Sequence, residues 1–141
     1  MGMALIVKKF GGSSVATPEK IMAVAQRVLR EKTPGDRVVV VVSAMGDTTD
    51  DLVTLAKDLV GNPYEYAREM DMLLSTGEQI TIALLAMTFN KIRHPAISFT
   101  GKQKRINTNK AKKKKKILGI EPKRVLKELD SGKIVVVAGF Q

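Results

Sequence analysis

A pair of glycines and a pair of serines follow the first apolar stretch of the sequence, in KKFGGSSV. Gly11 and Gly12 have no β-carbon, so their backbone N–H groups can approach anionic oxygens closely, and the N-terminus of a following helix would add attraction for phosphate. Ser13 and Ser14 add hydroxyl donors, and Lys9 adds a positive charge. The alternative is a tight turn from strand to helix. This segment is neither a Walker A loop nor a GxGxxG fingerprint, so taken alone it leaves both interpretations open.

Two later segments also carry polar side chains next to glycines. SAMGDTTD offers the hydroxyl groups of Ser43, Thr48 and Thr49, and its alternative role is an ordinary helix cap. STGEQ places Glu78 directly after a glycine at the predicted start of an apolar helix. The alternative for Glu78 is a favourable interaction with the helix dipole, without any function. We expect His94, which precedes a proline in a turn, to be a surface or capping residue, and no spacing of His, Asp and Glu suggests a metal site.

These segments follow stretches with the pattern of buried strands. Runs without polar residues are typical of parallel strands covered on both faces, and we expect this of Met3–Val7 and of the five valines Val38–Val42. Helices are expected between the strands. The order predicts an α/β fold with a largely parallel sheet flanked by helices, in which ligands bind beyond the carboxyl ends of the strands. Further strands are expected at residues 96–99 and 134–137.

The helix limits follow from capping signals and breakers. Thr17 followed by Pro18 predicts the start of a helix that ends near Lys32. Asp50 or Thr49 is expected to cap the second helix, in which Leu52, Leu55, Ala56 and Leu59 share a face. We expect residues 62–77 to be helical, Gly77 to interrupt the pattern, and a separate helix to span residues 78–90. The last helix begins at Glu121-Pro122, turns Val125, Leu126 and Leu129 inward and stops at Gly132.

Composition narrows the class of protein. With 141 residues, 44% of them hydrophobic, we expect one domain spanning residues 1–141. No apolar run reaches the roughly 18 residues of a membrane span, no signal peptide is evident and there is no cysteine, so we expect a cytoplasmic protein. The net charge of +10 is concentrated in residues 102–116, which hold nine basic and no acidic residues. We expect this segment to be a solvated, mobile loop.

Five segments in order resemble the N-terminal part of aspartokinase, an enzyme with the amino-acid-kinase fold: KKFGGSSV, VVVVVSAMGDTTDDL, MDMLLSTGEQITIALLAM, SFTG and VVAGFQ. The family transfers the γ-phosphoryl group of ATP, bound with Mg²⁺, to the β-carboxylate of L-aspartate, at the entry to lysine, threonine and methionine synthesis. The resemblance covers nearly the whole chain except about residues 102–116. It implies the N-terminal half of an amino-acid-kinase domain.

The resemblance also implies roles for individual residues. The Lys9 ammonium would offset charge on the transferring phosphoryl group, and Gly11, Gly12, Ser13 and Ser14 would face the ATP phosphates. Ser43 and Thr49 would lie beside L-aspartate, and Glu78 would bind its α-ammonium group. Phosphoryl transfer of this kind depends on positioning and electrostatic stabilisation, and needs no nucleophile from the protein.

Two features depart from the family pattern. After VVAGFQ the family continues into a second half with a GRGGSDTT motif, the adenine-binding elements and regulatory domains, whereas this sequence stops at Gln141. We therefore expect a truncated domain that is inactive in isolation. In residues 102–116, lysines replace small and apolar residues of the family, as if introduced or selected for solubility.

An alternative from a different class is a noncatalytic, engineered folded fragment whose lysine loop binds polyanions nonspecifically. The loop lacks aromatic residues that could stack on bases, which argues against specific nucleic-acid recognition. Apolar surface bared by the missing half would favour self-association.

Overall fold

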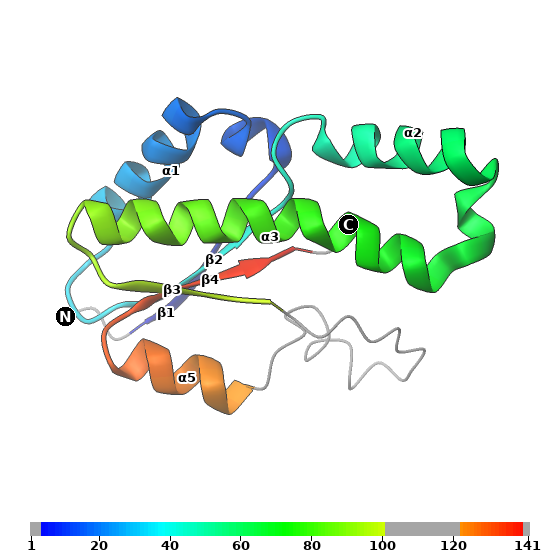
Figure 1. Ribbon diagram of the computed structural model, residues 1–141. Coiled ribbons are helices and arrows are strands. Elements are labelled where there is room, and N and C mark those ends of the chain that lie inside the picture. Colours follow the sequence, from blue (N-terminus) through cyan, green and yellow to red (C-terminus); the bar gives the residue numbers. More distant parts are fainter. Residues whose placement is uncertain (1–3, 101–121, 140–141) are drawn as a thin grey trace.

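The computed structural model describes residues 4–100 and 122–139. Within these residues one sheet has the strand order β1-β2-β4-β3, and every pairing is parallel. Its strands are β1 (Leu5–Phe10), β2 (Arg37–Val42), β3 (Ala96–Phe99) and β4 (Ile134–Ala138). The predicted α/β fold with a parallel sheet is confirmed (Figure 1).

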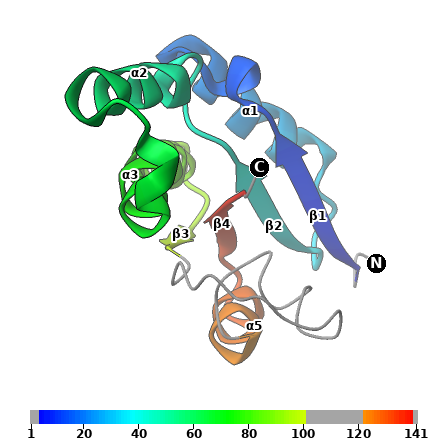
Figure 2. The same ribbon diagram turned by 90° about the vertical axis from the view of Figure 1, so that its right-hand side faces the viewer.

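Helices cover both faces of the sheet. Helices α1 and α3 lie over one face and α5 lies over the other, which gives three layers (Figure 2). Helix α2 lies beside the N-terminal part of α3. The helical elements are η1 (Gly12–Val15), α1 (Pro18–Glu31), α2 (Thr48–Val60), η2 (Pro63–Tyr66), α3 (Ala67–Lys91) and α5 (Pro122–Asp130).

Strand β2 lies inside the sheet with helices over both of its faces, as its five valines predict. Val38, Val40 and Val42 face α1 and α3, whereas Val39 and Val41 face α5. All five are buried. Successive side chains of a strand point to opposite faces, so a strand with a helix layer on each side can be apolar throughout.

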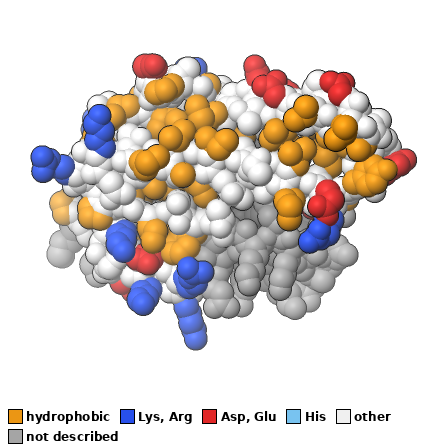
Figure 3. All heavy atoms as spheres, in the orientation of Figure 1, with side chains coloured by type: hydrophobic (Ala, Val, Ile, Leu, Met, Phe, Trp, Pro, Cys, Tyr) orange, Lys and Arg blue, Asp and Glu red, His pale blue; other side chains and the backbone are white. Residues whose placement is uncertain are grey.

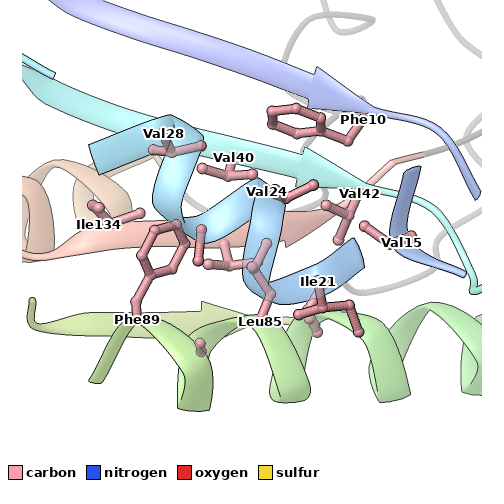
Figure 4. Packing of buried hydrophobic residues seen from close by; sticks show 14 of the residues in the cluster. Phe10, Val15, Ile21, Val24, Val28, Val40, Val42, Leu85, Phe89 and Ile134 are labelled. Carbon is pink, nitrogen blue, oxygen red and sulfur yellow. The ribbon is translucent and has the colours of Figure 1, made fainter. Parts of the chain in front are cut away.

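The larger part of the core lies between the sheet and helices α1 and α3 (Figure 4). Leu85 and Phe89 of α3 and Val28 of α1 are fully buried and surround Val40 of β2. The aliphatic composition of this layer agrees with the small number of aromatic residues in the sequence.

Strand β1 differs from the prediction in both limits and burial. It runs from Leu5 to Phe10, through the two lysines, rather than ending at Val7. Leu5 and Val7 are 51% and 60% exposed. The physical reason is position: β1 is an edge strand and α5 packs on β2 and β4, so no helix among the described residues covers the α5 side of β1. On the other side Lys8 pairs with Glu31 of α1.

Helix α1 confirms its capping signals. The Thr17 side chain accepts a hydrogen bond from the Lys20 backbone N–H (3.2 Å), Pro18 is the first helical residue, and Lys32 caps the C-terminus. Ile21, Val24, Ala25 and Val28 form the buried face.

Helix α3 contradicts the predicted interruption at Gly77. One continuous helix runs from Ala67 to Lys91. A β-carbon at Gly77 would lie 3.1 Å from Ala44 Cβ and 3.1 Å from Thr48 Cγ2. The glycine therefore allows close contact between the helix and the loop after β2, and packing outweighs its poor helix propensity.

Two smaller predictions about helices are also wrong, and the predicted shared face of α2 is only partly covered. Helix α2 begins at Thr48 after Asp47, so Thr49 and Asp50 lie in its first turn instead of capping it. Leu55 and Leu59 are 62% and 83% exposed, because α2 lies beside α3 and not on the sheet. In α5, Val125 and Leu129 are buried as predicted, but Leu126 is 41% exposed.

The stretch from Pro63 to Lys91 is long and apolar enough to cross a membrane when judged by length and composition alone. A core helix meets the same criteria. Here Ile82, Leu85 and Phe89 pack on the sheet, which is how a helix in a core behaves.

Candidate functional site

The segments after β1, β2 and β4 meet at the carboxyl edge of the sheet. Parallel strands all end there, so the predicted convergence follows from the topology. The Gly12 carbonyl accepts a hydrogen bond from the Gly46 backbone N–H (3.0 Å), and the Gly139 N–H donates to the Val42 carbonyl (2.9 Å). Both neighbouring loops are thereby tied to the loop that follows β2.

The two glycines of the first loop differ in their surroundings. A β-carbon at Gly12 would lie 2.8 Å from the Ala44 carbonyl oxygen, so Gly12 is required by the protein's own packing. At Gly11 a β-carbon would meet no atom within 4 Å, and the backbone has the ordinary extended values φ −81° and ψ 175°. Packing therefore explains the absence of a side chain at Gly12 and leaves it unexplained at Gly11.

Ser13 and Ser14 belong to η1 and are exposed. The Ser14 N–H donates to the Gly11 carbonyl (3.1 Å), which closes the turn, and the Lys20 ammonium donates to the Ser13 carbonyl (3.1 Å). Ser13 and Ser14 therefore lie just after the end of β1, the strand that contains Lys9.

Lys9 is exposed on the α5 side of β1, in register with Val41. Its Cε atom lies 4.0 Å from the position that a β-carbon of Gly139 would occupy. The Lys9 side chain therefore reaches across the sheet toward the end of β4. A β-carbon at Gly139 would also lie 2.9 Å from Val41 Cγ1, so close packing against β2 explains this glycine.

Glu78 lies on the sheet-facing side of α3. It precedes Ile82, Leu85 and Phe89 on one helical stripe, with spacings of four, three and four residues. Ile82, Leu85 and Phe89 pack in the core over the strands, whereas α3 continues toward its N-terminus past the carboxyl ends of the strands (Figure 1). The neighbouring Gly77 faces Ala44 and Thr48, which follow β2, so Glu78 lies near the edge where the loops meet.

The Glu78 carboxyl is half-buried, and this burial raises its pKa from 4.5 to about 7. The cause is burial by the surrounding residues, and no charged or hydrogen-bonding partner among the described residues contributes to the shift. Glu78 lies in the middle of α3, so the predicted interaction with a helix N-terminus does not apply. A carboxylate that is desolvated but not paired within the described residues suits a cationic ligand group.

Ser43 and Thr49 have different environments. Ser43 is 7% exposed and lies between Val42, which bonds to Gly139, and Ala44, which contacts both Gly12 and Gly77. It therefore sits at the centre of the edge. Thr49 is exposed in the first turn of α2, next to Thr48, whose Cγ2 atom faces Gly77.

Two residues of this edge were missed as contributors by the sequence reasoning. The sequence predicts a helix break at Gly77 and gives Gly139 no individual role. A glycine inside an otherwise strong helical pattern is a signal for close packing. That signal could have identified Gly77 as a packing residue.

Among the described residues, no group of three or more His, Cys, Asp or Glu side chains could hold a metal ion. The His94 Nδ1 atom lies 3.1 Å from the Pro95 carbonyl oxygen in the turn before β3. The predicted lysine loop, residues 102–116, lies outside the described residues.

A separate hollow of about 440 Å³ lies at the opposite edge, near the amino ends of β2 and β4. Its lining residues are Lys32, Gly35, Asp36, Arg37, Leu129, Asp130 and Gly132. None of them belongs to the carboxyl-edge site.

Comparisons with known proteins agree with this fold. The model of the amino acid kinase family matches residues 4–141. An aspartokinase of Bacillus sp. (strain MGA3) is 57% identical over 139 residues, which is 99% of this chain and 33% of the relative. An aspartokinase of Geobacillus stearothermophilus is 52% identical over 139 residues, 99% of this chain and 34% of the relative. The chain thus spans about a third of the length of these relatives.

A solved structure of aspartate kinase from Synechocystis superposes with a TM-score of 0.75 at 50% identity, covering 97% of this chain and 22% of that one. The chain therefore belongs to the amino acid kinase family, and within that family it resembles the N-terminal part of the aspartokinases.

Proposed function

We propose that this chain supplies the aspartate-binding and phosphate-binding part of an aspartokinase site, in which ATP phosphorylates the β-carboxylate of L-aspartate. The observation that carries the proposal is the arrangement of three groups at one edge of the sheet. These are the open Gly11 backbone, the Lys9 side chain that reaches toward Gly139, and the half-buried Glu78 carboxyl.

The phosphate side of the site uses the first loop. The backbone at Gly11 and the hydroxyl groups of Ser13 and Ser14 donate to phosphate oxygens, with Gly12 holding the loop against Ala44. The Lys9 ammonium offsets the negative charge that the transferring group carries. Such fixed donors act by electrostatic stabilisation, because their orientation is set before the substrate arrives.

The aspartate side uses α3 and the loop after β2. Glu78 accepts the α-ammonium group, while Ser43 and Thr49 donate to carboxylate oxygens. The ammonium replaces the water that burial removed from the Glu78 carboxyl, and so favours its charged form. An acceptor that is already a carboxylate needs little base catalysis, which agrees with a site without a described histidine.

ATP is a substrate and would bring Mg²⁺ with its phosphates. The described residues fit the phosphate groups, through Gly11 and Lys9, but provide no cluster of ligands for the metal ion itself. We therefore assign no residue of this chain to Mg²⁺. The enzyme class also leads us to propose a cytoplasmic protein of amino-acid biosynthesis that works with the remaining part of an aspartokinase.

The sharpest test uses L-aspartate and succinate, which lacks the ammonium group. Titration calorimetry should show that Glu78→Gln weakens L-aspartate binding at least tenfold at pH 8 and leaves succinate binding within about twofold. One lost charge-assisted contact accounts for this size of effect. Glu69→Gln, an exposed carboxylate on the same helix, is the matched control. Equal loss of both ligands would contradict the role given to Glu78.

The phosphate half is tested separately by Gly11→Ala. This residue has room for a β-carbon within the protein, so a loss of ATP affinity of about tenfold without loss of folding stability would locate phosphate beside it. Retained ATP affinity would remove Gly11 from the site. Coupled assays with ATP, Mg²⁺ and L-aspartate, on this chain alone and with the rest of an aspartokinase supplied, then measure turnover.

A further inference from the structure

Gly77 allows helix α3 to lie directly against the loop that follows β2 and the start of α2. A β-carbon at Gly77 would lie 3.1 Å from Ala44 Cβ, 3.1 Å from Thr48 Cγ2 and 3.7 Å from Leu52 Cδ1. The first two distances are shorter than an ordinary van der Waals contact, so a methyl group here would push one side away by a few tenths of an ångström. The helix and the loop therefore meet with no space for a side chain between them.

The residues at this contact are direct chain neighbours of the proposed aspartate-binding residues. The neighbouring pairs are Ser43 and Ala44, Thr48 and Thr49, and Gly77 and Glu78. Adjacent residues of one rigid element move together. The contact at Gly77 therefore sets how far the Glu78 carboxyl lies from the polar side chains that follow β2.

Glu78 carries the only charge in the middle of α3. Between Asp71 and Lys91 no other residue of this helix is charged. Figure 3 shows hydrophobic side chains gathered over α3 and the adjoining helices, with charged side chains mostly toward the rim of this face. This part of the helix can therefore attract the ammonium group of a ligand at one point only, and the position of α3 decides where that point lies.

The loop after β2 is held more firmly than the part of α3 that faces it. Hydrogen bonds tie this loop and the end of β2 to Gly12 on one side and to Gly139 on the other. Helix α3 is packed on the sheet from Ile82 onward, whereas toward its N-terminus it extends past the carboxyl ends of the strands (Figure 1). A methyl group at Gly77 would therefore displace the helix, and Glu78 with it, rather than the loop.

From these contacts we propose that Gly77 is a positioning residue of the aspartate-binding site. Its missing side chain keeps α3 against the loop, and so keeps Glu78 at the spacing from Ser43 and Thr49 that an amino dicarboxylate requires. The inference rests on the function proposed above. A misplacement of about 1 Å can cost about a hundredfold in catalysis, so a few tenths of an ångström should cost about fivefold in affinity for L-aspartate.

Titration calorimetry of Gly77→Ala at pH 8 tests this role. The variant should bind L-aspartate about fivefold more weakly than the parent, and should bind succinate and ATP within about twofold of it. Succinate lacks the ammonium group that Glu78 accepts, whereas a general loosening of the fold would weaken all three ligands. Ala83→Ser adds one atom at an exposed position of the same helix, and as the matched control it should leave all three affinities unchanged.

Two combined variants identify the route of the effect. Ala44→Gly and Thr48→Ser remove the two methyl groups that the new β-carbon would meet, so adding both to Gly77→Ala should restore L-aspartate affinity to within about twofold of the parent. In a Glu78→Gln background, Gly77→Ala should cause no further loss, because it acts only through Glu78. A triple variant that binds no better than Gly77→Ala, or a further loss in the Glu78→Gln background, would overturn the proposal.

The same measurements separate this inference from the proposed function. If Glu78→Gln weakens L-aspartate binding but Gly77→Ala does not, the aspartate site stands and the role of Gly77 fails. If the parent does not bind L-aspartate, or Glu78→Gln has no effect, the function given to Glu78 fails and the role of Gly77 fails with it. Circular dichroism checks each fold. Should Gly77→Ala be unfolded, the triple variant decides: L-aspartate affinity near that of the parent supports the role of this contact, and a large loss contradicts it.

Discussion

At the scale of single residues, neighbouring glycines serve different purposes. Gly12 faces the Ala44 carbonyl oxygen so closely that a β-carbon would lie 2.8 Å from it, whereas Gly11 faces open space. The same residue type therefore has an explanation in packing at one position and none at the next. The difference between Gly11 and Gly12 depends on atoms from distant parts of the chain. The sequence alone therefore could not distinguish the two glycines.

Substitution of Gly12 by alanine tests this difference. Gly12→Ala should lower the free energy of unfolding by about 1–3 kcal/mol, because the loop or Ala44 must move to admit the methyl group. Gly11→Ala is the control, and should leave stability unchanged or raise it by up to about 1 kcal/mol. Urea denaturation measures both. Similar losses in the two variants would contradict the assignment of Gly12 to packing.

Glu78 gives a second prediction, on pH dependence. Its folded pKa, about 7, lies above the ordinary 4.5, so folding favours the protonated form. Stability should therefore fall as pH rises from about 4.5 to 7 and then stay level. Because the group is half-exposed, solvent screening reduces the cost to the order of 1–2 kcal/mol.

Glu78→Gln removes this cost. The variant should exceed the parent in unfolding free energy by the order of 1–2 kcal/mol at pH 8 and match it at pH 4.5. Urea denaturation at both pH values gives the difference, with Glu69→Gln as the exposed control. A gain of the same size at both pH values would show that burial of charge is not its cause. The pKa shift could not be foreseen, because burial of Glu78 depends on the packing of other elements.

At the scale of elements, local capping signals were reliable. Thr17 and Pro18 predicted the start of α1 to the residue, because an N-cap depends on atoms within one helical turn. Gly77 shows the opposite case. Its low helix propensity predicted a break, but the contact with Ala44 and Thr48, which lie about 30 residues earlier in the chain, keeps α3 continuous.

The cap of α1 supplies the third prediction. Thr17→Ala removes the acceptor of the Lys20 N–H and should lower the free energy of unfolding by about 1 kcal/mol. Thr17→Ser keeps the hydroxyl oxygen and should recover most of the loss. Chemical denaturation of the three proteins provides the comparison, and an alanine variant as stable as the parent would show that this hydrogen bond contributes nothing.

Strand β1 and helix α2 show why exposure was harder to predict than element type. Val7 and Leu59 are apolar in the sequence and belong to the expected kinds of element, yet they are exposed. Whether an apolar side is covered depends on which element the topology places against it. The sheet order β1-β2-β4-β3, which leaves β1 at an edge, could not be predicted from the pattern of apolar and polar residues.

At the scale of the whole molecule, the side of the sheet facing α1 and α3 holds the larger core. Phe89 is fully buried there. Phe89→Ala should lower the free energy of unfolding by about 3–5 kcal/mol, through lost burial and the cavity left behind. Leu59→Ala, at a residue that is 83% exposed, should cost less than about 0.5 kcal/mol. Thermal or urea unfolding compares the two, and a large loss at Leu59 would mean that another surface covers α2.

The strand order also governs the sequence of events during synthesis. Among the described strands, β3 pairs only with β4, which follows it in the chain by more than 30 residues. A growing chain therefore carries β3 unpaired, and β2 with one unpaired edge, until β4 has left the ribosome. Nascent chains should aggregate most readily in that interval, because their strand edges are exposed. Chaperones that shield strand edges should therefore have most effect then.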